Sequence, residues 1–163
     1  MAAPASVPHV FIACAPPDLK YAELIISRAR SDRLPLRLGM FGEGRFTDTD
    51  WQLECRRRIA SAKAVLVLVS MHTRRSPRAL WQVRCAREQG LPVVGLIVAP
   101  ANGPSHAAEA PVEAQASIGW RWKTIAATLM QFADGPAGRT SEHGRATRAT
   151  PAPLPAAAHG SAA

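Results

Sequence analysis

Four short apolar segments alternate with amphipathic segments along the chain. The apolar segments are residues 9–15, 34–41, 64–69 and 92–98, and the third, AVLVLV, has no polar residue. After each of them, directly or beyond a loop, apolar side chains recur at the three- and four-residue spacing of a helix that buries one face. A strand that is apolar at every position is covered on both faces. The pattern therefore predicts an α/β fold in which helices cover both faces of a parallel sheet.

Short polar residues, proline and glycine indicate where the helices begin and end. Ser76 followed by Pro77 is typical of a helix start, because the hydroxyl accepts from a free backbone amide and proline fits the first turn. Gly90 favours a helix end. The candidate capping residues are Asp18 for the first helix and Asp48 or Thr49 for the second. The final helix has one apolar stripe, made of Trp122, Ile125, Ala126, Leu129 and Ala133.

A ligand is expected at the carboxyl ends of the strands, because open parallel sheets bind ligands outside those ends. In this chain the ends comprise residues 14–18, residues 40–43, residues 70–74 and the residues after Val98. The helix that begins at Ser76 starts next to one of these ends. Gln82, in the second turn of that helix, is thus predicted to lie near the cleft.

Composition divides the chain of 163 residues into three parts. Residues 134–163 are rich in alanine, proline and glycine and have little with which to build a core, so we expect a disordered tail. Residues 1–7 form a short N-terminal extension. Residues 8–133 are enough for one core, and we expect them to form a single domain.

The net charge of +8 is weak support for any particular partner. The tail has three arginines and two acidic residues, so 8 minus 1 leaves +7 on the rest of the chain. The basic residues are nearly all arginine, which together with the excess of alanine and proline suggests coding bias. No basic run with interleaved aromatic residues is present, so nucleic acid is not expected as a partner.

Several features indicate a cytoplasmic protein. No segment approaches the roughly 20 apolar residues of a membrane span, and MAAPASVPHV lacks the charged start and long apolar core of a signal peptide. Cys14, Cys55 and Cys85 lie in apolar settings without Cys-x-x-Cys spacing. We expect reduced, buried thiols and no bound metal, with a nucleophilic cysteine or a metal site as the alternative.

Three positions are candidates for chemistry. Gln82 falls in the middle of the apolar arc of its helix, where an amide without hydrogen-bond partners costs about 1–3 kcal/mol. It is either bonded to a neighbouring loop or has a function. GMFGEG at residues 39–44 is either a turn or a phosphate-binding loop, although it lacks the P-loop lysine. His72, at a strand end, is either an ordinary polar residue of a loop or an acid–base group.

Four segments in order resemble the TIR-like family that includes the Thoeris antiphage proteins. They are HVFIACAPPD, a tryptophan helix ending RRRIASAKAVLVLVSMHTRRS, LWQVRCAREQGLPVVGLIV and GWRWKTI. The resemblance extends over about residues 8–130 and implies a flavodoxin-like α/β domain. It also implies NAD+, or a related nucleotide, as substrate or ligand without a separate cofactor, self-association through TIR contacts, and a downstream effector.

The family keeps a Trp-Glu-Ile/Val step in its third helix, and its glutamate cleaves the nicotinamide–ribose bond of NAD+. Trp81, Gln82 and Val83 occupy that step here. The resemblance thus assigns Gln82 to the catalytic position. The substrate-binding residues it implies lie at the strand ends and beside Gln82, and they are Cys14, Ala15, Asp18, Phe41, His72 and Trp81.

The chain departs from the family at other positions near the expected pocket. Ala13 and Cys14 replace a polar and an aromatic residue at the end of the first strand, and Arg78 lies near the place of a tryptophan. A glutamine lacks the charge that stabilises the positive ribose centre of the transition state. Two hypotheses follow. The first is an antiphage enzyme that cleaves NAD+ or converts it to an ADP-ribose-type signal and that is impaired by Gln82 unless Glu88 or Glu43 substitutes for the glutamate. The second is a catalytically silent module that binds a nucleotide or assembles with other TIR domains.

Overall fold

A computed structural model describes residues 6–42, 44, 47–98, 114 and 116–135. The predicted disordered tail lies outside the described residues from residue 136 onward, and so do most of the predicted N-terminal extension and Glu43.

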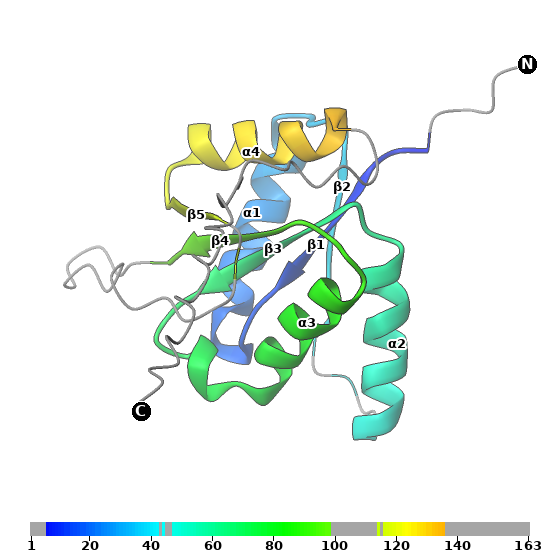
Figure 1. The fold of residues 1–163 in the computed structure, drawn as a ribbon. Coiled ribbons are helices and arrows are strands. Elements are labelled where there is room, and N and C mark those ends of the chain that lie inside the picture. The colour runs from blue at the N-terminus through cyan, green and yellow to red at the C-terminus, as the bar shows by residue number, and fades with distance from the viewer. Residues whose placement is uncertain (1–5, 43, 45–46, 99–113, 115, 136–163) are drawn as a thin grey trace, which may run out of the picture.

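Five strands and four helices make up the described part of the chain (Figure 1). In chain order they are β1 (His9–Ala13), α1 (Leu19–Ser31), β2 (Arg37–Met40), α2 (Asp48–Ala60), β3 (Ala64–Val69), α3 (Pro77–Glu88), β4 (Val93–Ile97), β5 (Ala116–Gly119) and α4 (Trp122–Asp134). Two single turns of 3-10 helix, η1 (Pro16–Asp18) and η2 (Thr73–Arg75), precede α1 and α3. Of these helices, none has the length and apolar character needed to cross a bilayer.

The sheet is parallel throughout, with the order β2-β1-β3-β4-β5. This is the flavodoxin-like strand order. Helices α2 and α3 cover one face of the sheet, and α1 and α4 cover the other (Figure 1). The predicted fold class, a flavodoxin-like parallel sheet with helices on both faces, is confirmed.

Alternate side chains of the inner strands build two separate cores. In β1, Val10 and Ile12 pack with α1 and α4, whereas Phe11 and Ala13 pack with α2 and α3. β3 alternates in the same way, and its residues from Ala64 to Leu68 are buried. The prediction that AVLVLV is covered on both faces is confirmed, because successive side chains of a strand point to opposite faces.

The fifth strand, β5, corrects the sequence-based expectation of four. Its sequence is ASIG, and three of its four residues are exposed. It joins the edge of the sheet by pairing with β4 from Val94 to Ile97. Backbone pairing and the one half-buried side chain of Ile118 hold this edge strand, so hydrophobic patterning does not detect it.

The helix boundaries agree with the sequence at α3 and differ at α1 and α2. Ser76 Oγ accepts from the amide of Ala79 at 3.2 Å, and Gly90 follows α3 with a φ of 70°. Helix α2 is capped by Thr47, one residue before the predicted Asp48 or Thr49, and its hydroxyl accepts from the amide of Asp50. Asp18 precedes α1 but its side chain makes no capping bond, which is a second correction.

Candidate functional site

The loops that follow β1 and β3 meet at the carboxyl edge of the sheet. The chain turns from β1 toward β2 on one side and from β3 toward β4 on the other, so the two loops leave in opposite directions. Asp18 and Ser70 join them, because Ser70 Oγ donates to the Asp18 carboxylate at 2.5 Å. Divergence of this kind opens a crevice at the switch point of the sheet, where such folds bind ligands.

Short hydrogen bonds fix the loop between β3 and α3. Thr73 is buried, and its Oγ1 donates to the carbonyl of Leu68 and accepts from the amide of Ser70, both at 2.9 Å. The amide of His72 donates to Ser70 Oγ at 3.0 Å. Asp18, although only 2% exposed, has its hydrogen-bond partner in Ser70. The Asp18 carboxylate therefore orders the wall of the crevice instead of capping α1.

A cleft of about 880 Å³ opens beside this junction, within the size range of small-molecule sites. It extends from the β1–α1 loop to the first turns of α2 and α3. Its described lining residues are Ala15, Pro16, Pro17, Asp48, Trp51, Gln52, His72, Arg74, Arg75, Ser76, Pro77, Arg78, Leu80, Trp81 and Arg84.

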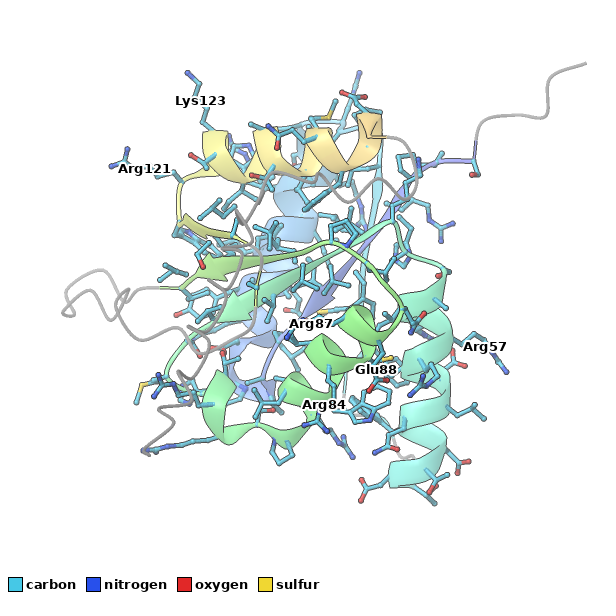
Figure 2. The ribbon with its side chains drawn as sticks, in the orientation of Figure 1. Arg57, Arg84, Arg87, Glu88, Arg121 and Lys123 are labelled. Carbon is cyan, nitrogen blue, oxygen red and sulfur yellow. The ribbon has the colours of Figure 1, made fainter. Side chains whose placement is uncertain are left out.

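Arginine dominates the charge of the cleft. Arg74, Arg75, Arg78 and Arg84 line it, and Asp48 is the one carboxylate among the described lining residues. Asp48 already accepts from the Arg78 guanidinium at 3.2 Å. Figure 2 shows Arg84 projecting from α3 on the side away from the sheet. Among the described lining residues, four guanidinium groups thus outnumber one carboxylate, and an excess of positive charge attracts anionic ligands.

Aromatic rings form the wall between α2 and α3. Trp51 and Trp81 pack edge to face with centroids 5.4 Å apart, and Phe41 lies 6.0 Å behind Trp51. The Arg78 guanidinium lies 4.8 Å from the Trp51 ring, and that of Arg56 lies 5.8 Å from Trp81. Trp51 and Trp81 both line the cleft, so the ligand space has an apolar wall beside its cationic groups.

Gln82 is buried between α2 and α3 and is not among the described residues that line the cleft. Its side chain hydrogen-bonds the Cys55 thiol, which opposes but does not overcome the effect of burial, and the pKa of Cys55 rises to about 12. Gln82 Oε1 has no described partner, and neither does Nε1 of the buried Trp51 on the facing helix. The amide predicted to need partners is thus only half satisfied.

Of the remaining sequence-predicted residues, some line the cleft and the others lie behind its lining residues. Ala15, His72 and Trp81 line the cleft. Cys14 and Asp18 are buried at the end of β1, and burial, together with the Asp18 charge, raises the pKa of the Cys14 thiol to about 12. Phe41 is not among the described lining residues, and it contacts Trp51, which lines the cleft.

Glu88, one of the two acids that the sequence offered as a substitute for a catalytic glutamate, is not among the described residues that line the cleft. Glu88 pairs with Arg56 at 3.6 Å, is half exposed and lies on the side of α3 that faces α2 (Figure 2). Glu43 is outside the described residues. All three cysteines are free and buried, as predicted, and no group of three or more potential metal ligands occurs in the described part of the chain.

The arginines of the cleft were not predicted as a group from the sequence. Arg74, Arg75 and Arg84 were ascribed to the general arginine content of the chain, yet all three line one cleft. The available signal was the run MHTRRSPR at residues 71–78. In it, Arg74 and Arg75 follow a predicted strand, and Arg78 lies in the first turn of the next predicted helix.

Comparison with known proteins supports the fold. No protein-family model matches the chain, and no curated protein matches it. The chain is similar to a 3-dehydroquinate dehydratase-like protein from Bifidobacterium longum, with a TM-score of 0.50 and 12% identity over 77% of this chain and 95% of that one. It is also similar to a protein from Burkholderia pseudomallei described as pilus assembly-related, with a TM-score of 0.48 and 10% identity over 82% and 94% of the two chains. At 12% identity, the first similarity shows the α/β fold alone.

Proposed function

We propose that the protein is a TIR-like module that binds NAD+ or a related nucleotide in the cleft at the carboxyl edge of the sheet. With glutamine at position 82, we expect it to have little NAD+-cleaving activity. The observation on which the proposal rests is the combination of four arginines and two tryptophans around one cleft of about 880 Å³. The sequence resemblance to the Thoeris type of TIR-like protein supplies the expected context, antiphage signalling.

The arginines suit the pyrophosphate of a dinucleotide. A guanidinium forms two parallel hydrogen bonds to phosphate oxygens, and such charge-assisted bonds are stronger than neutral ones. Arg74 and Arg75 come from the loop after β3, whereas Arg84 comes from α3. Because they approach from different elements, they can contact the two phosphates of one ligand from different sides.

The tryptophans suit the planar rings of the same ligand. Trp81 is partly exposed and lines the cleft next to Leu80. A nucleobase or nicotinamide ring stacks on such an aromatic surface with a gain beyond simple area burial. A ligand with two phosphates and planar rings therefore uses both kinds of wall.

The lack of a negative charge at position 82 argues against efficient cleavage. Breaking the nicotinamide–ribose bond builds positive charge on the ribose, which a nearby carboxylate stabilises. Gln82 is neutral, and the one described carboxylate of the cleft, Asp48, is paired with Arg78. The proposed module therefore binds its ligand without the anion that the reaction requires.

Calorimetric titration with NAD+ and ADP-ribose at low salt tests the proposal, with nicotinamide riboside as the phosphate-free control. We expect binding of both phosphate-bearing ligands and much weaker binding of the riboside. Arg84→Ala should weaken NAD+ binding by about tenfold or more, since a charged hydrogen bond contributes roughly 1.5–3 kcal/mol. The matched control is Arg57→Ala on the outer side of α2 (Figure 2), which should leave affinity unchanged. Absence of binding at millimolar NAD+ and ADP-ribose would contradict the proposal.

A second candidate function, NAD+ processing, is favoured by the register of Trp81, Gln82 and Val83 with the family's Trp-Glu-Ile/Val step. Its test is NAD+ consumption followed by liquid chromatography and mass spectrometry, comparing the chain with its Gln82→Glu variant, each with and without a crowding agent. Turnover by the Gln82→Glu variant alone would indicate an NAD+-processing site that lacks its catalytic carboxylate. The same measurement would identify the product that a downstream effector could detect. Silence of a folded variant rejects this function and leaves nucleotide binding.

Assembly is part of the proposal, because the resemblance implies TIR–TIR contacts. Light scattering with and without NAD+ measures it directly. We expect nucleotide to increase the average mass of the particles. A strict monomer that binds no nucleotide would exclude both the binding and the assembly roles.

A further inference from the structure

A second polar groove lies at the opposite end of the sheet, where β1 begins, and the strand rise of about 3.3 Å per residue makes β1 itself about 13 Å long. It has a volume of about 480 Å³ and forms where β1 and β2 begin and α2 ends. The side chains with charge or hydrogen-bonding capacity that line it include His9, Arg37, Arg58, Ser61 and Lys63.

His9 is held in this groove in a defined orientation. Its Nδ1 lies 3.4 Å from Ser61 Oγ, and the single hydroxyl proton of Ser61 is donated to the carbonyl of Arg58 at 2.8 Å. The Ser61 oxygen is therefore the acceptor and His9 Nδ1 the donor. In β2, Gly39 leaves room for the ring, since a Cβ there would lie 2.7 Å from His9 Nε2. The backbone carbonyl of His9 accepts from the Lys63 amide at 2.8 Å, which brings Lys63 to the groove.

The groove has an excess of positive charge that the fold does not explain. Arg58 is paired with Glu54 at 3.0 Å, and its place in the last turn of α2 suits the helix dipole. Arg37 and Lys63 have no carboxylate partner among the described residues, and no acidic residue occurs in MAAPA at residues 1–5. Burial, Arg37 and Arg58 all lower the pKa of His9, against the opposing effect of its contact with Ser61.

We propose that this groove is a phosphate-binding site, in which Arg37, Lys63 and His9 hold the phosphate group of inorganic phosphate or of a small phosphorylated metabolite. Two cations from different strand beginnings and an imidazole converge on one space. A doubly charged anion supplies the missing negative charge and bonds best to the protonated imidazole. Binding of the dianion thus favours proton uptake by His9 and raises the pKa of its ring. The volume exceeds that of inorganic phosphate alone, so the groove also has room for the organic part of a phosphate ester.

Histidine resonances followed by NMR as a function of pH and added anion test the site in the full chain. His9 reports on the groove, and His72 reports separately on the cleft. The probes are inorganic phosphate, glucose 6-phosphate and, as the uncharged control, glucose. We expect either phosphate probe to move the His9 resonance and raise its pKa at constant ionic strength. Saturation by both probes at similar concentrations indicates a site for the phosphate group alone, and tighter binding of the ester indicates a metabolite site.

Variants localise the effect. Arg37→Gln with Lys63→Gln should weaken phosphate binding at least about tenfold while leaving the fold intact, because both substitutions lie at the edge of the molecule. Arg84→Ala, in the cleft, should leave the His9 response unchanged. The proposal is overturned if neither phosphate probe shifts His9 at tens of millimolar, or if the double variant responds like the original chain. Neither outcome depends on whether NAD+ binds at the cleft.

Discussion

The two faces of the sheet differ in whether their buried polar side-chain atoms have hydrogen-bond partners. On the face covered by α1 and α4 the buried core is aliphatic except for Cys14, and Trp122 Nε1 donates to Asp32 at 2.6 Å. On the face covered by α2 and α3, the buried Gln82 Oε1 and Trp51 Nε1 have no described partner, and two thiols, of Cys55 and Cys85, are buried nearby. The cleft opens on the second face alone.

This difference separates a face whose buried polar side-chain atoms are paired from one that holds unpaired polar atoms beside the cleft. Buried polar atoms are nearly always hydrogen-bonded, so unpaired ones need a reason. Both unpaired atoms of the described part belong to the α2–α3 contact, where Trp51 also forms the wall of the cleft. The α2–α3 face therefore accepts a cost in free energy for the buried polar groups that it holds.

The largest expected effect tests the packing of the α1–α4 face. Leu129→Ala removes a fully buried side chain from α4 and should lower the free energy of unfolding by about 2–5 kcal/mol. Urea denaturation followed by circular dichroism measures it. Leu53→Ala on the exposed side of α2 is the control and should change stability by less than about 0.5 kcal/mol. Equal effects at the two positions would refute the assignment of the core.

A carboxylate at position 82 tests the other face. Gln82→Glu places an ionisable group in a buried site and should lower the free energy of unfolding by about 3 kcal/mol at pH 8. Burial raises the pKa of a carboxyl group in the folded state. The lost stability should therefore return as the pH falls through that raised pKa, because the folded protein binds the proton more tightly. The same denaturation at pH 8 and pH 5 measures the difference.

The matched substitution Gln82→Met keeps the volume and removes the polar atoms. It should change stability by less than about 1.5 kcal/mol, because the unpaired Oε1 disappears together with the weak bond to Cys55. A loss comparable to that of Leu129→Ala would mean that the amide has partners which stabilise the fold, and would remove the contrast between the faces.

The helix caps of α2 and α3 sharpen the comparison within one face. Ser76→Ala should cost about 1 kcal/mol, in the usual range for losing a cap. Thr47→Ala should cost less, since Thr47 is exposed and water can replace its bond to the Asp50 amide, whereas Ser76 is buried. Thermal unfolding of the two variants compares them directly. The reverse order would show that α2 depends more on its cap than burial suggests.

The smallest expected effect concerns His9, whose ring lies on the α2–α3 side of β1 against Ser61. Burial and the charges of Arg37 and Arg58 lower its pKa below the ordinary 6.5. The unfolded chain then binds a proton more readily than the folded protein, so stability rises with pH across the interval below 6.5 and levels off above it. In phosphate-free buffer, His9→Gln should remove this slope between pH 5 and pH 7, and an unchanged slope would assign it to other groups.

Local sequence patterns determined much of the fold. The run AVLVLV predicted a strand buried on both faces, Ser76 with Pro77 and Gly90 marked the ends of α3, and the apolar arc of α3 predicted that Gln82 is buried. Each of these signals depends on residues within a few turns or strand positions of one another. Such short-range preferences can therefore be read without the rest of the molecule.

Tertiary structure alone decided the candidate site. The order of the strands brings Asp18 and Ser70 together across 52 positions of sequence, and it gathers Ala15, Trp51 and Arg84 around one cleft. The partner of Asp18, the turning of Gln82 toward Cys55 rather than toward the cleft, and the pairing of β5 with β4 all depend on contacts between distant segments. Periodicity shows which side of a helix is buried, but which groups that side meets depends on how the sheet is ordered.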